Sequence, residues 1–397
     1  MRDQGLPEGM IRKLWGEFND LFHREATQAT QQALKELLRE SLQGELEVVV
    51  GCGRYERSEN RTTVRHGSYP RTLGTTVGEI AFRMPRAKKV KWDKKILRNY
   101  QRRADDFDMA VMACFLMGSS TRKSALVGEL FAGTKISAST VSNILKRVDG
   151  VLAAWRRRKL EDRYRFLILD GLSVPVRMVH NRRRMVLLAV GVTQDFRIEV
   201  VGFMVAPSES ELYWRSLLDD LAGRGLVGDS LTMIAHDGAS GIKAAVADVY
   251  PYTQTQLCVF HTLKNVSERI RHRKNRDELM DDASRVYDAE TLGELERRAG
   301  SFRKKWESRE QRAVRTLFRH LEASTRYFQL PKSQWHVIRT TNRVERLIGE
   351  IRRRIRPMGA FVNVRSCERI IFSLITVLAP MEEDMPSTDK TESHHTT

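Results

Sequence analysis

The chain has 397 residues, of which 41% are hydrophobic, so it is long enough for two to four domains with apolar cores. Lys and Arg total 68 against 50 for Asp and Glu, and the net charge of +18 favours nucleic acid as partner over a small metabolite. A merely solvated basic surface and one that binds anionic lipid are the alternatives. No apolar run approaches the ~18 residues of a membrane span, and the first residues lack the apolar core of a signal peptide. We therefore expect a cytoplasmic, nucleoid-associated protein with no membrane partner.

Four cysteines occur in the chain, at positions far apart and without a CxxC pair. They are Cys52, Cys114, Cys258 and Cys367. This spacing argues against a disulfide framework and against a complete zinc site.

The N-terminal part combines a helix with β-prone segments. Apolar residues recur at helical spacing through residues 8–45, within an expected helical region of residues 1–50. Residues 51–104 contain closely spaced glycines and β-prone pieces such as TTVGEIAFRMP, followed by the basic segment RAKKVKWDKK. We expect a β-containing region here, with a basic loop or linker after it.

Residues 105–155 are predicted to form a helix-turn-helix DNA-binding domain. Three short helical segments are expected, and Ser137 is a good N-cap for the third, which runs to about residue 148. Its buried stripe is formed by Val141, Ile144, Leu145 and Val148. Its other side chains could enter a DNA groove, and those expected to contact DNA are Ser139, Thr140, Asn143, Lys146 and Arg147. A plain helical bundle with a polar outer face is the alternative.

An α/β pattern begins at about residue 160. Hydrophobic strands are predicted at 165–176, 182–192, 197–207, 231–238 and 253–260, with helices at 211–226 and 242–250. This order is typical of a mixed sheet that begins as an antiparallel meander and ends in parallel crossovers. Charged helices over 267–335 indicate a helical insertion. The α/β domain is therefore expected to comprise 160–266 and 336–380, before a polar, disordered tail at 381–397.

Two acids follow apolar strands of this α/β region. Asp170 follows RFLIL, and Asp237 follows LTMIAH. A carboxylate within a buried strand is costly unless it is paired or binds a metal ion. If the two strands are neighbours, the two acids meet at one edge of the sheet. Each acid could instead cap the turn after its strand, and Asp-Gly at 237–238 is an ordinary turn pair.

A third acid, Glu345, lies in the segment TTNRVER at the start of a predicted helix. Asn342 and Arg346 flank it and could orient DNA or a carboxylate. With Asn342 or Thr341 as N-cap, Glu345 also fits a capping box, which is a purely structural role. Glu350 lies five residues further along the helix and is therefore turned away from Glu345.

These segments together resemble the Mutator-type family of bacterial insertion-sequence transposases. The shared pattern includes GRYERSENRTTVRHGSYPRTL, strand-Asp-Gly, GVTQDFRIEVVGFMVAPSESELYWRSLLDDLAGRGL, strand-His-Asp-Gly, CVFHTLKN and TTNRVER, over about residues 50–375. The resemblance implies a ribonuclease-H-like catalytic domain whose Asp-Asp-Glu triad falls on Asp170, Asp237 and Glu345. These carboxylates are expected to hold two Mg²⁺ ions, for which Mn²⁺ can substitute.

Further residues are expected near this site or on DNA. Cys258 and His261 match the family's Cys-x-x-His element; as zinc ligands they are half a site, so packing or hydrogen bonding to DNA is the favoured role. His236, Asn342 and Arg346 are also expected near the site. Residues expected to contact the DNA backbone are Lys264, where many relatives have Arg, and the row Arg352, Arg353 and Arg354.

The sequence therefore predicts a transposase that binds the terminal inverted repeats of an insertion sequence, frees a 3′-hydroxyl and transfers that strand. At least a dimer is expected, because two DNA ends must be brought together. A DNA-binding regulator with a degenerate catalytic domain is one alternative. A ribonuclease-H-like nuclease or Holliday-junction resolvase is the other, and inverted repeats bracketing the gene would favour transposition over both.

Overall fold

The computed structural model describes residues 8–88, 90, 92–132, 136–178, 183–339 and 342–378. The chain divides into two compact units, at the peptide bond between Leu145 and Lys146. The tail predicted at 381–397 lies outside the described residues. In the part of the chain that is described, no helix combines the length and the apolar character needed to cross a membrane.

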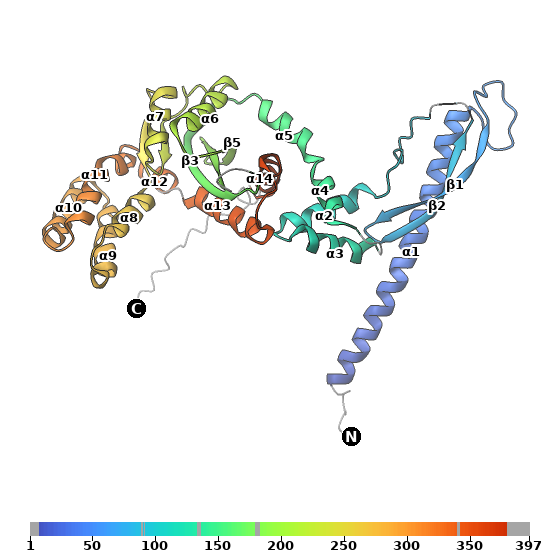
Figure 1. Ribbon diagram of the computed structural model, residues 1–397, viewed down its shortest axis with the longest axis horizontal. Helices are drawn as coiled ribbons and strands as arrows, with labels where there is room; N and C mark the ends of the chain where they lie inside the picture. Colours follow the sequence, from blue (N-terminus) through green and yellow to red (C-terminus); the bar gives the residue numbers. More distant parts are fainter. Residues whose placement is uncertain are drawn as a thin grey trace, which may run out of the picture. The chain divides into compact units, whose positions relative to one another are not determined.

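The first unit begins with the long helix α1 (Glu8–Val50), which lies beside a β-hairpin (Figure 1). The hairpin is formed by β1 (Arg65–Thr75) and β2 (Gly78–Ala87), which pair antiparallel. Buried apolar side chains join the helix to the hairpin and the following loop: Leu42, Leu73, Phe82, Met84 and Leu97. The β-containing region predicted after residue 50 is therefore a hairpin packed on a helix.

Helix α1 extends five residues beyond its predicted end at 45. Leu46 and Val50 lie one helical turn apart and pack against Trp92, which comes from the basic loop. The helix ends where Gly51 takes a positive φ of 81° and donates its N–H to the carbonyl of Glu47.

Three short helices complete the first unit and pack on one another: α2 (Asp105–Leu116), α3 (Thr121–Ala132) and α4 (Ala138–Leu145). The predicted N-cap of the third helix is confirmed, because Ser137 Oγ accepts the N–H of Thr140 at 3.1 Å. The helix ends at Leu145, however, and not at 148. Lys146 and Arg147 therefore lie in the turn that follows α4.

The next helix, α5 (Val148–Arg157), belongs to the second unit. Its Asp149 accepts two hydrogen bonds, at 2.6 and 2.7 Å, from the guanidinium of Arg369 on α14 (Val364–Leu378). Arg369 is itself buried and lowers the pKa of Asp149. This long-range ion pair holds α5 on α14, which explains why the predicted helix breaks before residue 148.

A five-stranded mixed sheet forms the centre of the second unit, in the order β5-β4-β3-β6-β7. The strands β3, β4 and β5 form an antiparallel meander, whereas β6 and β7 add parallel to β3, so the predicted topology is confirmed. Their bounds are Tyr164–Pro175 (β3), Arg183–Thr193 (β4), Ile198–Ala206 (β5), Met233–His236 (β6) and Gln254–Leu257 (β7).

Helices cover both faces of this sheet (Figure 1). One face packs on α6 (Glu211–Gly223) and α7 (Ser240–Val249), around Trp214, Leu218 and Ile242. The other packs on α5, α13 (Asn342–Ile355) and α14. Burial on both faces explains why β3 and β4 are almost continuously hydrophobic.

Among the described residues, five helices lie between β7 and α13: α8 (Val259–Glu268), α9 (Arg276–Tyr287), α10 (Leu292–Trp306), α11 (Gln311–Ser324) and α12 (Lys332–Ile338). Two predicted elements differ here. The strand expected to reach residue 260 ends at Leu257, and α8 begins at once. The charged segment expected to be helical from residue 267 is interrupted between α8 and α9, where the buried carboxylate of Glu310 accepts the backbone N–H groups of Arg271 and His272.

Candidate active site

The pairing of β3 with β6 brings two acids to the same level of the sheet. Ile168 lies opposite Ala235 in this parallel pair. Two residues further along the chain are Asp170, within β3, and Asp237, directly after the end of β6, so the two acids lie at about the same level of the sheet. The two acid-bearing strands are therefore neighbours, which is the condition under which the sequence places both acids at one edge of the sheet.

Asp170 is a buried carboxylate within a strand. Its side chain is 8% exposed, and its Oδ1 accepts the N–H of Gly171 at 2.7 Å. Burial raises the pKa of Asp170 to about 6, against the hydrogen bond from Gly171 and the nearby His261, which lower it. The nearby charges of Asp237 and Glu345 also raise this pKa.

Asp237 lies between β6 and α7. Its Oδ1 accepts the N–H of Ala239 at 2.9 Å, so it caps the turn that starts the helix. The carboxylate also lines the cavity described below. Asp237 therefore caps the turn after its strand, which was the structural role considered from its sequence, and it lines the same cavity as the other acids.

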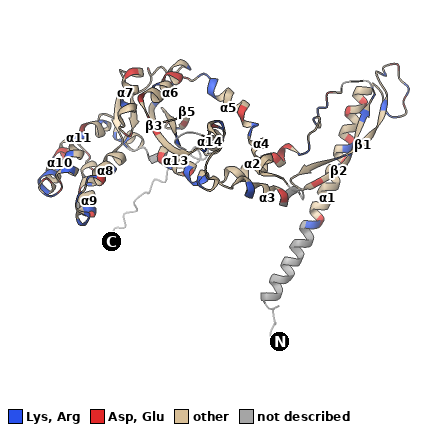
Figure 2. Cartoon of the chain, in the orientation of Figure 1, with Lys and Arg blue, Asp and Glu red and all other residues tan. Residues whose placement is uncertain are grey.

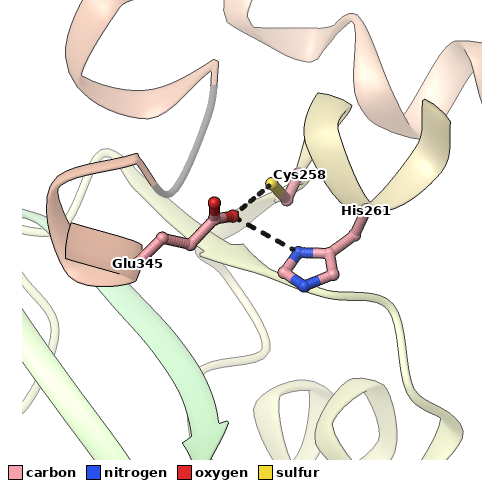
Figure 3. A group of neighbouring side chains, drawn as sticks. All are labelled: Cys258, His261 and Glu345. Carbon is pink, nitrogen blue, oxygen red and sulfur yellow. Dashed lines mark hydrogen bonds and ion pairs between the residues drawn. The ribbon is translucent and has the colours of Figure 1, made fainter. Parts of the chain in front are cut away.

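Glu345 reaches the same place from a distant part of the chain. The N–H of Val259, at the start of α8, donates to the carbonyl of Arg339 at 3.1 Å, and this contact places the end of α12 beside α8. The first turn of α13 follows, with Glu345 directed at α8 (Figure 3). Its Oε1 lies 4.0 Å from Cys258 Sγ and 3.9 Å from His261 Nδ1.

Cys258 and His261 thus face a carboxylate, and with Glu345 they form a group of three potential metal ligands. Cys258 is completely buried and its S–H can donate to Glu345. The Nδ1 atom of His261 is buried without a hydrogen-bond partner among the described residues. Cys258 can therefore hold the Glu345 carboxylate in place, and the sulfur, nitrogen and oxygen donors together would suit a softer ion than Mg²⁺.

All three acids line one cavity of about 770 Å³. Its walls also carry two cationic side chains, Lys264 of α8 and Arg352 of α13, and His320 from α11. Both cations were predicted to contact DNA. A cavity that combines an acidic floor with cationic walls can bind divalent ions and a phosphate group together.

Several predicted residues lie elsewhere. His236 is buried on the opposite side of β6 from Asp237; it accepts the N–H of Gly238, and burial lowers its pKa to about 4. Arg354 is only 6% exposed and pairs with Glu350, so the expectation that it contacts DNA does not fit its position.

Arg353 is exposed but also pairs with Glu350, at 2.7 Å. Arg346 is exposed outside the cavity wall. Asn342 begins α13, and its side chain lies outside the described part of the structure.

The predicted DNA-reading residues of α4 are at the surface or partly so. Asn143 is exposed, whereas the hydroxyls of Ser139 and Thr140 both hydrogen-bond to that of Ser137. Lys146 and Arg147 are exposed beyond the end of the helix.

One acid of the cavity was not found from the sequence. Glu209, in the loop between β5 and α6, lines the cavity beside Asp170 and Asp237. Burial and the charge of Asp237 raise its pKa. The available signal was indirect: Gly171, directly after Asp170, leaves the space that the Glu209 side chain occupies.

Sequence comparison relates this chain to a family of known proteins. Residues 17–385 match the model of the family described as Transposase, Mutator family. The transposase for insertion sequence element ISRM5 of Rhizobium meliloti (strain 1021) is 31% identical, over 87% of this chain and 86% of that protein.

Two further relatives are similar over most of their length. The transposase for insertion sequence element IS406 of Burkholderia multivorans is 30% identical, over 87% of this chain and 89% of that protein. The transposase for IS905 of Lactococcus lactis is 27% identical, over 86% and 87% respectively. This chain therefore belongs to the Mutator family of transposases.

Proposed function

We propose that this transposase binds the terminal inverted repeats of an insertion sequence, cuts DNA to free a 3′-hydroxyl and transfers that strand. The observation that carries the proposal is the meeting of Asp170, Asp237 and Glu345 in one cavity. They come from β3, from the turn between β6 and α7, and from α13. The adjacent parallel strands with matched acids support a ribonuclease-H-like domain, as the family resemblance implies.

The donor set fits Mg²⁺ or Mn²⁺. Hard divalent ions prefer carboxylate oxygens, and the three acids supply such oxygens. Asp170 is more than nine-tenths buried, and within the described residues its side chain receives one hydrogen bond, from Gly171. A buried carboxylate with so little compensation is unfavourable without a cation nearby. Asp170, Asp237 and Glu345 would hold the ions, which supply activation of the attacking oxygen and neutralisation of charge on the phosphate.

The residues around the acids have distinct tasks in this proposal. Lys264 and Arg352 lie in the cavity wall and bind the phosphates on either side of the reacting one. Cys258 and His261 keep the Glu345 carboxylate turned towards the cavity. Because these contacts join α13 to residues at the start of α8, the relative position of the two helices determines where the Glu345 carboxylate lies in the cavity.

A basic groove in the first unit supports DNA binding there. Figure 2 shows Lys and Arg on α1 and on the hairpin that packs against it. The groove is lined by seven cationic side chains: Lys35, Arg39, Arg54, Arg57, Arg61, Arg65 and Arg83. Among the described residues, Glu56 is the one acid in this lining. Tyr55 is 89% exposed in the same wall, with the guanidinium of Arg54 over its ring. Such a surface is suited to phosphates and to stacking on a base or sugar.

In this proposal the groove supplies sequence-independent affinity, and α4 reads the sequence. The packing of α2, α3 and α4 supports a helix-turn-helix unit, in which the exposed Asn143 would reach base edges. Two element ends must be held at once, so we also propose that the protein acts as at least a dimer.

The proposal is tested by strand cleavage and strand transfer on labelled element ends with Mg²⁺ or Mn²⁺. Asp170→Asn and Asp237→Asn are expected to abolish both reactions and to leave DNA binding intact. Near wild-type cleavage by either variant would remove that residue from the site. Binding without any cleavage by the wild-type protein would favour a regulator, and cleavage without joining would favour a nuclease.

A further inference from the structure

The cavity contains a fourth carboxylate, Glu209, placed there by a loop rather than by a strand or helix. The loop joins β5 to α6. Glu209 lies directly against the backbone next to Asp170: a Cβ built on Gly171 would lie 1.7 Å from Glu209 Oε1. Any side chain at 171 would therefore occupy the position of this carboxylate.

The backbone of Glu209 is held as firmly as its side chain. A Cβ built on Gly241, in the first turn of α7, would lie 2.7 Å from the carbonyl oxygen of Glu209 and 2.7 Å from the amide nitrogen of Glu211. Because α7 starts immediately after Asp237, the same turn that positions Asp237 also packs against Glu209. Two close glycine contacts thus fix Glu209 relative to both aspartates of the site.

In the part of the chain that the structure describes, no hydrogen bond and no ion pair to the Glu209 carboxylate is found, and the nearby His261 favours its charged form. Its side chain is half-buried. A structural carboxylate in this position would cap α6 or pair with a base, and the N-cap of α6, Ser210, makes no side-chain cap bond either. A half-buried carboxylate with so little compensation, in a cavity that Asp170 and Asp237 also line, is costly unless a cation binds there.

We propose that Glu209 is a fourth metal-binding carboxylate, which acts with Asp170 and Asp237 in the cavity that all three line. The inference rests on the proposed metal-dependent function. It changes the expected donor set from three acids to four. Since Glu209 adds a negative charge to the site, its main effect is on the affinity for the divalent ion.

The test is a titration of the full-length protein with Mn²⁺, in which the EPR signal of free Mn²⁺ measures how much of the ion is bound. Glu209→Gln keeps the shape of the side chain and removes its charge, and we expect at least a roughly tenfold loss of Mn²⁺ affinity. Glu211→Gln is the matched control, because Glu211 is an exposed acid two residues away that does not line the cavity, and it should bind as the wild type does. Cleavage by Glu209→Gln should recover in part as the Mn²⁺ concentration is raised.

Two results would overturn the inference. In the first, Glu209→Gln binds Mn²⁺ as tightly as the wild type, while Asp237→Asn binds it more weakly. This result leaves the proposed function standing and removes Glu209 from the metal site. The other is no difference among wild type, Glu209→Gln and Asp237→Asn, which removes the metal-dependent function itself. A lower melting temperature of Glu209→Gln with unchanged Mn²⁺ binding would assign Glu209 a structural role only.

Discussion

Replacing Asp170 by Asn should abolish cleavage and also make the protein more stable. The pKa of this carboxyl is about 6 in the fold, against an ordinary value of 3.8, because burial disfavours the charged form. At neutral pH the ionised side chain therefore costs the folded state about 3 kcal/mol. The amide carries no charge, and its oxygen can still accept the N–H of Gly171, which now bonds to Asp170 Oδ1.

The sign of the pH dependence follows from the direction of this shift. A carboxyl with a raised folded-state pKa keeps its proton longer in the fold than in the unfolded chain. The stability that protonated Asp170 contributes is therefore full below the ordinary pKa of 3.8 and is lost as the pH rises to about 6. Above about pH 6 the contribution of this group no longer changes with pH. The advantage of Asp170→Asn over the wild type should be largest near neutral pH and should shrink towards pH 4.

Thermal unfolding without divalent ions measures this difference. After allowance for the cost of placing the new NH₂ group, we expect the variant to gain about 1–3 kcal/mol, or about 2–10 °C in Tm, at about pH 7.5, and much less at about pH 4.5. Asp229→Asn, at an exposed acid in the loop before β6, is the control and should leave Tm unchanged. An Asp170→Asn variant no more stable than the wild type at either pH would refute the account of a costly buried charge.

Three further predictions concern the third acid and the DNA contacts. Glu345→Gln should stay folded, bind DNA and lose cleavage. Glu350→Gln should retain cleavage and lose some thermal stability, because Glu350 pairs with two arginines outside the cavity. The reverse pattern in a cleavage assay would show that Glu350 is the third acid. Replacing Arg54 and Arg57 by Glu in the full-length chain should weaken binding to terminal-repeat and random DNA alike. The salt dependence of binding should fall by about one counterion for each phosphate that the variant no longer binds. An unchanged slope in a salt titration would exclude the groove as a DNA-binding surface. Asn143→Ala should cost about 1–3 kcal/mol at one base pair of the repeat and relax specificity there, and equal discrimination by variant and wild type in a binding-site competition would assign Asn143 no base contact.

Local patterns in the sequence determined the elements that carry the first two acids. The apolar runs before Asp170 and Asp237 predict buried strands, because strands covered on both faces must be hydrophobic at every position. The order of strands and helices predicts the mixed sheet, and Ser137 predicts the start of α4 through its short-range hydrogen bond. These features depend on contacts within one element or between neighbouring elements, so a single sequence is sufficient to find them.

Tertiary structure decided the remainder of the site. Glu345 lies 87 residues from Cys258, and its direction depends on the contact between the end of α12 and α8, for which the segment TTNRVER carries no local signal. Arg354 looked like one more cation in a basic row, yet its place on the inner face of α13 buries it. Glu209 lies in a polar loop and becomes part of the site only because Gly171 and Gly241, from two other elements, leave room for it. Such placements are set by the packing of distant segments against the sheet, and this packing depends on the shapes of many side chains at once rather than on the period of any one segment.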